Sequence, residues 1–188
     1  MAVTPMKTLR SASPSFYRWE HLVKNEYRLS NGPDIQGILS LMYQPSILFT
    51  PKSVDFYQAH ADMAGHRYFC KCVFAEGAFR GCLLQEEEAD QPLLFYDYRA
   101  PKHFWSKPSR IIVCDSGRFW RWKEGKDKGY WSLERGAEKY LELWSTEPQL
   151  HGSVRVCNPI FFQLRDWQAM MAFSIYLALG PMRPIRHG

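Results

Sequence analysis

Apolar residues near the start of the chain recur at intervals of three and four positions, the spacing of an amphipathic helix. Ser13-Pro14 suits a helix start and Asn31-Gly32-Pro33 suits its end, so we predict a helix between these signals. Two further helices are predicted, from Asp34 to about Tyr43 and from Thr50-Pro51 to Gly65. The apolar stripe of the first helix consists of Phe16, Trp19, Val23 and Tyr27.

After Gly65 the apolar period shortens to two, and aromatic, cysteine and β-branched residues become frequent. The acidic run from Glu86 to Asp90 is interpreted as a solvated hairpin loop, because like charges gain nothing from burial. The pattern predicts strands at 67–74, 78–85, 92–98, 110–114, 118–124, 130–131 and 153–157.

Two more helices are predicted in the last third of the chain. The second of them runs from Gln163 to Leu179 and stops at Gly180-Pro181. Because it is apolar on most faces, we expect it either in the core or at an interface with another chain. The first begins at Ser132 and ends before Pro148, and its apolar side consists of Leu133, Ala137, Tyr140, Leu141 and Trp144.

Together these elements predict the α+β class: a central, mainly antiparallel sheet with N-terminal helices and two C-terminal helices packed on it. A chain of 188 residues fits one domain, which we place at 13–180. Residues 1–12 are expected to be a flexible N-terminus, and 181–188 a basic C-terminal tail.

The chain carries 24 lysines and arginines against 19 aspartates and glutamates, a net charge of +5, and 15% of its residues are aromatic. This balance favours an anionic partner, although a surplus of surface lysine and arginine explains it as well. Five cysteines and an N-terminus without a long apolar core predict reduced thiols in an intracellular, cytoplasmic protein. The apolar segment 169–179 is too short to cross a bilayer, so no membrane span is expected.

The segment 118–124 carries the leading candidate for a binding surface. Strand alternation places Trp120 and Trp122 on one face and Phe119, Arg121 and Lys123 on the other. If the indoles are core, the second face is exposed, where a ring and cations can stack on bases and neutralise phosphates. The competing interpretation is a solvated strand face over a tryptophan core. The predicted nucleic-acid-binding residues are Phe119, Arg121, Lys123, Lys126, Lys128, Lys102, Lys107 and Arg110.

Several potential zinc ligands occur close together, namely His60, His66, Cys70, Cys72 and Cys82. Structural zinc sites use ligand pairs roughly two to four residues apart on turns, with a second distant pair. Cys70 and Cys72 instead share one face of a predicted strand, where a free cysteine behaves as a small buried hydrophobe. We therefore expect core cysteines and predict neither a metal nor a cofactor.

The run from Asp62 to Phe69 resembles the signature of hot-dog-fold acyl thioesterases, in which an aspartate precedes a Gly-His pair. The resemblance implies that Asp62 is the catalytic acid and that the Gly65 N–H polarises a thioester carbonyl. The family has a long helix directly after this motif, whereas 67–74 reads as a strand here. A helix that ends at Gly65, with His66 near its last carbonyls, explains the same residues.

Three functional hypotheses follow. The first is a non-catalytic binding protein that contacts an anionic partner, RNA or single-stranded nucleic acid first, through the outward face of 118–124. The second is a structural subunit of a larger assembly or a homo-oligomer, with the apolar helix 163–179 at the interface. The third is an acyl thioesterase that uses Asp62. No nucleophile elbow, phosphate-binding loop or dinucleotide glycine motif occurs, so no catalytic residue is assigned.

Overall fold

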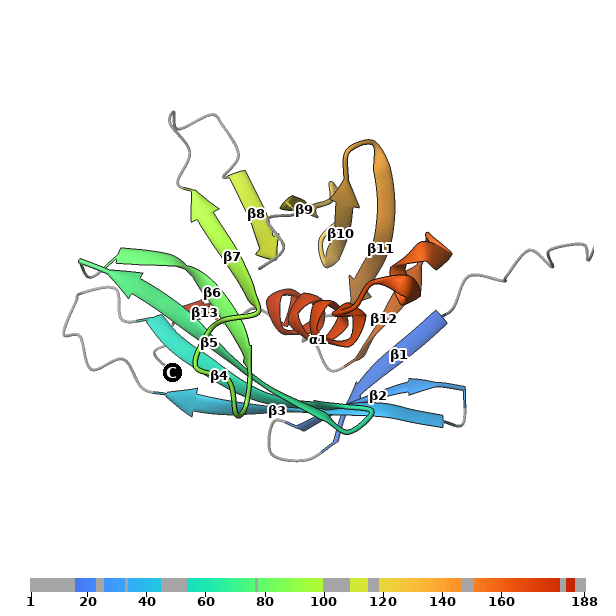
Figure 1. Cartoon of the computed structure of the whole chain (residues 1–188), viewed down its shortest axis with the longest axis horizontal. Coiled ribbons are helices and arrows are strands. Elements are labelled where there is room, and N and C mark those ends of the chain that lie inside the picture. The colour runs from blue at the N-terminus through green and yellow to red at the C-terminus, as the bar shows by residue number, and fades with distance from the viewer. Residues whose placement is uncertain are drawn as a thin grey trace, which may run out of the picture.

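The computed structural model describes residues 16–22, 26–32, 34–44, 54–76, 78–99, 109–114, 119–146, 151–179 and 182–184. Within these residues thirteen strands form a single sheet. One α-helix, α1 (Trp167–Ala178), lies within the curve of this sheet, and Figure 1 shows strands around it.

Strands β1 to β12 of the sheet form a closed ring in which each strand pairs antiparallel with the next one along the chain. Its first half consists of β1 (Phe16–His21), β2 (Glu26–Asn31), β3 (Asp34–Gln44), β4 (Val54–Met63), β5 (His66–Ala75) and β6 (Ala78–Glu86). Its second half consists of β7 (Leu94–Arg99), β8 (Ser109–Cys114), β9 (Phe119–Glu124), β10 (Tyr130–Arg135), β11 (Glu138–Ser145) and β12 (His151–Val156). β12 pairs with β1 and closes the ring. β13 (Met182–Pro184) pairs with β4 next to the stretch that pairs with β5.

Helix α1 fills the interior of the ring. Its sequence, WQAMMAFSIYLA, contains no charged residue, and every residue from Ala169 to Ala178 is buried. A helix that is apolar all round must be covered on all sides, and a closed sheet supplies that cover. The helix lies against β4, β5, β7 and β11.

The predicted helix from Gln163 to Leu179 is confirmed in its main part, and it lies in the core. It begins later than expected, because Leu164, Arg165 and Asp166 turn the chain from the 3-10 helix η1 (Pro159–Gln163) into α1. In the part of the chain that the structure describes, no helix is long and apolar enough to cross a lipid bilayer.

The three predicted N-terminal helices are wrong, because their described residues form β1 to β4. In β1 Tyr17 and Trp19 are buried while Phe16 and Arg18 are exposed, which is a period of two. The helical stripe was misleading because Trp19 and Tyr27 are both buried but belong to two strands of one hairpin. In β4 the inward residues are Ala59, Ala61 and Met63.

The predicted helix from Ser132 to before Pro148 is also wrong, because its described residues form β10 and β11 with a turn at Gly136-Ala137. The pairing of β10 with β11 skips Tyr140, so Tyr140 and Leu141 are both buried and imitate helical spacing. The α+β class with helices packed outside the sheet is therefore wrong: the sheet is the wall, and the single α-helix described lies inside it.

The predicted strands are confirmed as β5 to β9 and β12, and the short one at 130–131 is the start of β10. The predicted helix starts at Ser13-Pro14 and Thr50-Pro51 lie outside the described residues, as do 1–12 and 185–188.

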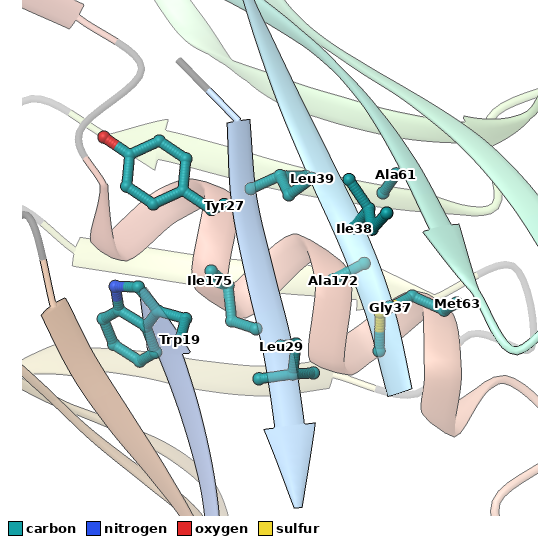
Figure 2. Close-up of a pocket in the computed structure, with 10 residues that line it drawn as sticks. All are labelled: Trp19, Tyr27, Leu29, Gly37, Ile38, Leu39, Ala61, Met63, Ala172 and Ile175. Carbon is teal, nitrogen blue, oxygen red and sulfur yellow. The ribbon is translucent and has the colours of Figure 1, made fainter. Parts of the chain in front are cut away.

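The pairing of β1 with β12 closes the ring, and we call it the seam. Trp19 of β1 lies at this seam and is buried in the core. It is 1% exposed, and its register partner across the seam is Gly152 of β12. A methyl group at residue 152 would overlap the indole ring, so the seam needs glycine there for its space. The same indole lines a void of about 10 Å³ with Ala172 and Ile175 of α1, which is too small for a ligand (Figure 2).

We expect Gly152→Ala to lower the free energy of unfolding by about 2 kcal/mol, because the added methyl forces Trp19 from its position. The measurement is denaturant unfolding at equilibrium. Ser153→Ala, the neighbouring residue in β12, is the matched control and should change stability by less than about 0.5 kcal/mol. Equal stability of Gly152→Ala and wild type would contradict the packing argument.

Candidate functional site

The outward residues of β9 form the surface that the sequence predicts, and we call Phe119, Arg121 and Lys123 the β9 face. Burial alternates along the strand: Trp120 and Trp122 are buried, while all three residues of the β9 face are exposed. Phe119 is 63% exposed, which is high for an aromatic ring. The predicted division of this strand into an indole side and a cationic side is confirmed.

Acidic neighbours reduce the positive charge of the β9 face. Lys123 forms an ion pair with Glu134 of β10, which also accepts a 3.0 Å hydrogen bond from the Ser132 hydroxyl. Burial raises the pKa of Glu134, but the bonds from Lys123 and Ser132 outweigh it and leave the pKa below its usual range. One of the two cations of the β9 face is therefore engaged within the chain.

A second carboxylate, Glu142 of β11, interacts with further cations on the outer surface of the same strands. It accepts hydrogen bonds from Lys139 at 2.6 Å and from the Tyr130 hydroxyl at 2.8 Å, and it lies 3.8 Å from Arg155. Burial raises the pKa of Glu142, but the bonds from Lys139 and Tyr130 outweigh it and lower the pKa overall. The outer wall over β10 to β12 therefore alternates in charge and is not a continuous basic stripe.

The other predicted nucleic-acid-binding residues are spread more widely. Lys126 and Lys128 are exposed in the turn between β9 and β10, close to the β9 face in sequence. Arg110 lies in β8, one residue before Ile111, which is the register partner of Arg121. Lys102 and Lys107 lie outside the described residues.

A hollow of about 660 Å³ opens where β5 begins, β6 ends and α1 begins, and we call it the mouth pocket. Three segments that are distant in sequence form it: the β5–β6 pair, the loop from β6 to β7, and the turn from η1 to α1. The residues of its lining that carry rings or charge include His66, Tyr68, Glu86, Phe162, Arg165, Asp166 and Trp167.

Aromatic rings make up part of the lining of the mouth pocket. Phe162 and Trp167 meet edge to face with ring centroids 5.2 Å apart, a favourable geometry for such pairs. His66 and Tyr68 stack with centroids 6.4 Å apart. These pairs give the pocket fixed apolar surfaces beside its polar groups.

Two carboxylates give the mouth pocket a negative field. Burial raises the pKa of Tyr68 to about 12, and the negative charges of Glu86 and Asp166 add to that rise. Both carboxylates therefore act on the same buried phenol. The cationic residue of the lining, Arg165, is exposed, whereas Asp166 is half-buried.

The residues of the thioesterase-like motif form the hairpin between β4 and β5 at the rim of this pocket. The Gly65 N–H donates a 3.1 Å hydrogen bond to the Asp62 carboxylate, which closes the turn. Nearby, Glu87 pairs with Arg67 at 2.9 Å and with His60 at 3.7 Å. The residues after the motif form β5, so the expected helix is missing here and the Gly65 N–H is engaged by Asp62 itself.

The cysteines of the predicted core positions lie in β5 and β6. Cys70 and Cys82 are fully buried, and Cys72 is half-buried against the core. Among the described residues there is no group of three or more histidine, cysteine, aspartate or glutamate side chains that could hold a metal ion.

Sequence reasoning missed the mouth pocket. Its only local signals are the acidic run after Leu84 and the tryptophan at the start of the last helix, and neither indicates a cavity alone. The chain matches no protein-family model, no curated protein and no solved structure.

The pKa of Tyr68 predicts how stability changes at alkaline pH. An unfolded tyrosine has a pKa of about 10, and folding raises that of Tyr68 to about 12. Stability from this group is complete below about pH 10 and falls as pH rises towards 12, because only the unfolded chain then releases the proton. We expect Tyr68→Phe to make the fall over this window shallower in denaturant unfolding at a series of pH values. An unchanged slope would contradict this origin.

Proposed function

We propose that the protein binds a small organic cation, an amine with an aromatic or aliphatic body, in the mouth pocket. The observation that carries this proposal is the shared lining of one hollow by the rings of Phe162 and Trp167 and the carboxylates of Glu86 and Asp166. A volume of about 660 Å³ falls in the range of about 300–1,000 Å³ that is typical of small-molecule sites.

The chemistry of the lining selects against other charge types. An ammonium group gains about 0.5–2 kcal/mol over an aromatic face and pairs with carboxylates. An anionic ligand would meet the field of Glu86 and Asp166, which already opposes ionisation of Tyr68. Arg165 also lines the pocket; it is exposed, as Glu86 is, whereas Asp166 is half-buried, so solvent screens the charge of Asp166 least.

Three probes of similar shape test the charge preference: phenethylamine, phenethyl alcohol and hydrocinnamate. Tryptophan fluorescence and calorimetry should show the amine binding most tightly and the carboxylate most weakly. Trp167→Ala should weaken amine binding about tenfold and Glu86→Gln about fivefold. Glu76→Gln, in the turn between β5 and β6, is the matched control and should have no effect. Equal affinity for the three probes, or no binding, would reject the proposal.

We also propose weak binding of RNA or single-stranded nucleic acid at the β9 face. It is supported by the 63% exposure of Phe119 beside the exposed guanidinium of Arg121. Base stacking contributes about 1–3 kcal/mol per base in known single-strand binders. One ring with few uncommitted cations therefore gives low affinity that falls with salt.

Binding at the β9 face is tested by how well oligothymidylate retains the protein at low salt. Arg121→Ala should reduce retention, and Glu134→Gln should increase it, because loss of the carboxylate charge releases Lys123. Glu76→Gln makes the same change in net charge away from this wall and serves as the control. If Glu134→Gln and Glu76→Gln raise retention equally, only net charge matters and the β9 face is not the site.

The remaining sequence hypotheses gain less from the geometry. Helix α1, the expected interface of a structural subunit or homo-oligomer, is covered by the strands of its own chain. The cytoplasmic location stays a proposal from the sequence, and no disulfide joins Cys70, Cys72, Cys82 and Cys157 among the described residues. Thioesterase activity at Asp62 stays a prediction, with Asp62 engaged in its own hairpin turn.

A further inference from the structure

Two cysteines face each other in the wall of the ring. Cys72 of β5 and Cys82 of β6 are register partners, and their sulfur atoms lie 3.9 Å apart. Opposed residues of antiparallel strands have Cα atoms about 4.5–5.5 Å apart, within the range of about 4.4–6.8 Å that a disulfide spans. A disulfide between them therefore requires rotation of two side chains and little movement of the strands.

The two thiols differ in access and in acidity. Cys72 is half-buried, whereas Cys82 is fully buried. The hydrogen bond with Cys82 lowers the pKa of Cys72, burial raises it, and the Tyr176 hydroxyl, 3.7 Å away on α1, lowers it, with a net decrease. Burial raises the pKa of Cys82. Because the thiolate is the nucleophile, Cys72 is the residue that reacts first.

We propose that Cys72 and Cys82 are an oxidation site at which hydrogen peroxide converts two thiols into an intramolecular disulfide. The Cys72 thiolate attacks one peroxide oxygen, the O–O bond breaks, and the departing hydroxide takes up a proton to become water. The Cys82 sulfur then attacks the sulfenic sulfur of Cys72, the S–O bond breaks, and a second water leaves with the Cys82 proton. Two thiols and one peroxide thus give one disulfide and two waters.

Cys70 and Cys157, the other cysteines whose side chains the structure describes, lack this combination of partner and access. Cys70 lies on the same strand as Cys72 but is fully buried, and burial raises its pKa. Cys157 follows β12, and burial raises its pKa as well. The pair is therefore selected by its register across β5 and β6.

Peptide mapping of the full chain tests the proposal without any substitution. Trypsin cleavage after Lys71 and Arg80 separates Cys72 in 72–80 from Cys82 in 81–99, while Cys70 falls in 68–71 and Cys157 in 156–165. After treatment with stoichiometric peroxide and alkylation, the digest should contain 72–80 linked to 81–99. Dithiothreitol should release the two peptides.

Variants then test the order of events. Cys82→Ser should leave a sulfenic acid at Cys72 that dimedone traps, and Cys72→Ser should leave Cys82 unmodified. Cys157→Ser is the control and should form the link as fully as wild type. A link to the Cys70 peptide, or peroxide consumption with 72–80 and 81–99 still separate, would overturn the proposal. The wild-type map decides the question even if a variant does not fold.

Discussion

Helix α1 has no polar side to present to water, and the rest of the described chain is arranged around that constraint. Met171, Phe173 and Tyr176 are fully buried, and burial of each large apolar side chain contributes about 1.5–3 kcal/mol. An open sheet covers one side of a helix, whereas a ring covers all of them. Three buried polar groups have no hydrogen-bond partner among the described residues: the Ser174 hydroxyl and the indole N–H groups of Trp19 and Trp120. Each costs about 1–3 kcal/mol, which burial of the apolar side chains has to offset.

A filled interior places binding chemistry at the end and on the outside of the ring. The internal void in Figure 2 holds about 10 Å³, whereas the mouth pocket at the start of α1 has about 660 Å³. Asp166 precedes the first turn of α1, where the positive end of the helix dipole stabilises a carboxylate. The same turn therefore ends the apolar core and begins the polar lining of the pocket.

The outer wall shows why net charge is a poor guide to a binding surface in this protein. The chain has a net charge of +5, yet Glu134 and Glu142 each engage lysine on the wall over β9 to β12. The carboxylates that lie beside each lysine on neighbouring strands, rather than the net charge of the chain, decide how much positive charge remains for a partner. The positive charge that stays available on this wall therefore depends on the strand register, which the amino-acid composition does not reveal.

Local sequence patterns predicted β5 to β9, the start of β10, β12, the inward indoles of β9 and most of helix α1. Each has a local pattern that only one period fits. Only the tertiary structure showed that β1 to β4, the rest of β10 and β11 are strands, because their short apolar stripes fit both periods. The mouth pocket and the pairing of Cys72 with Cys82 also depend on the tertiary structure, because each brings residues of separate segments together. The physical reason is that strand hydrogen bonds and the cover of α1 come from residues distant in sequence, so local spacing cannot specify them.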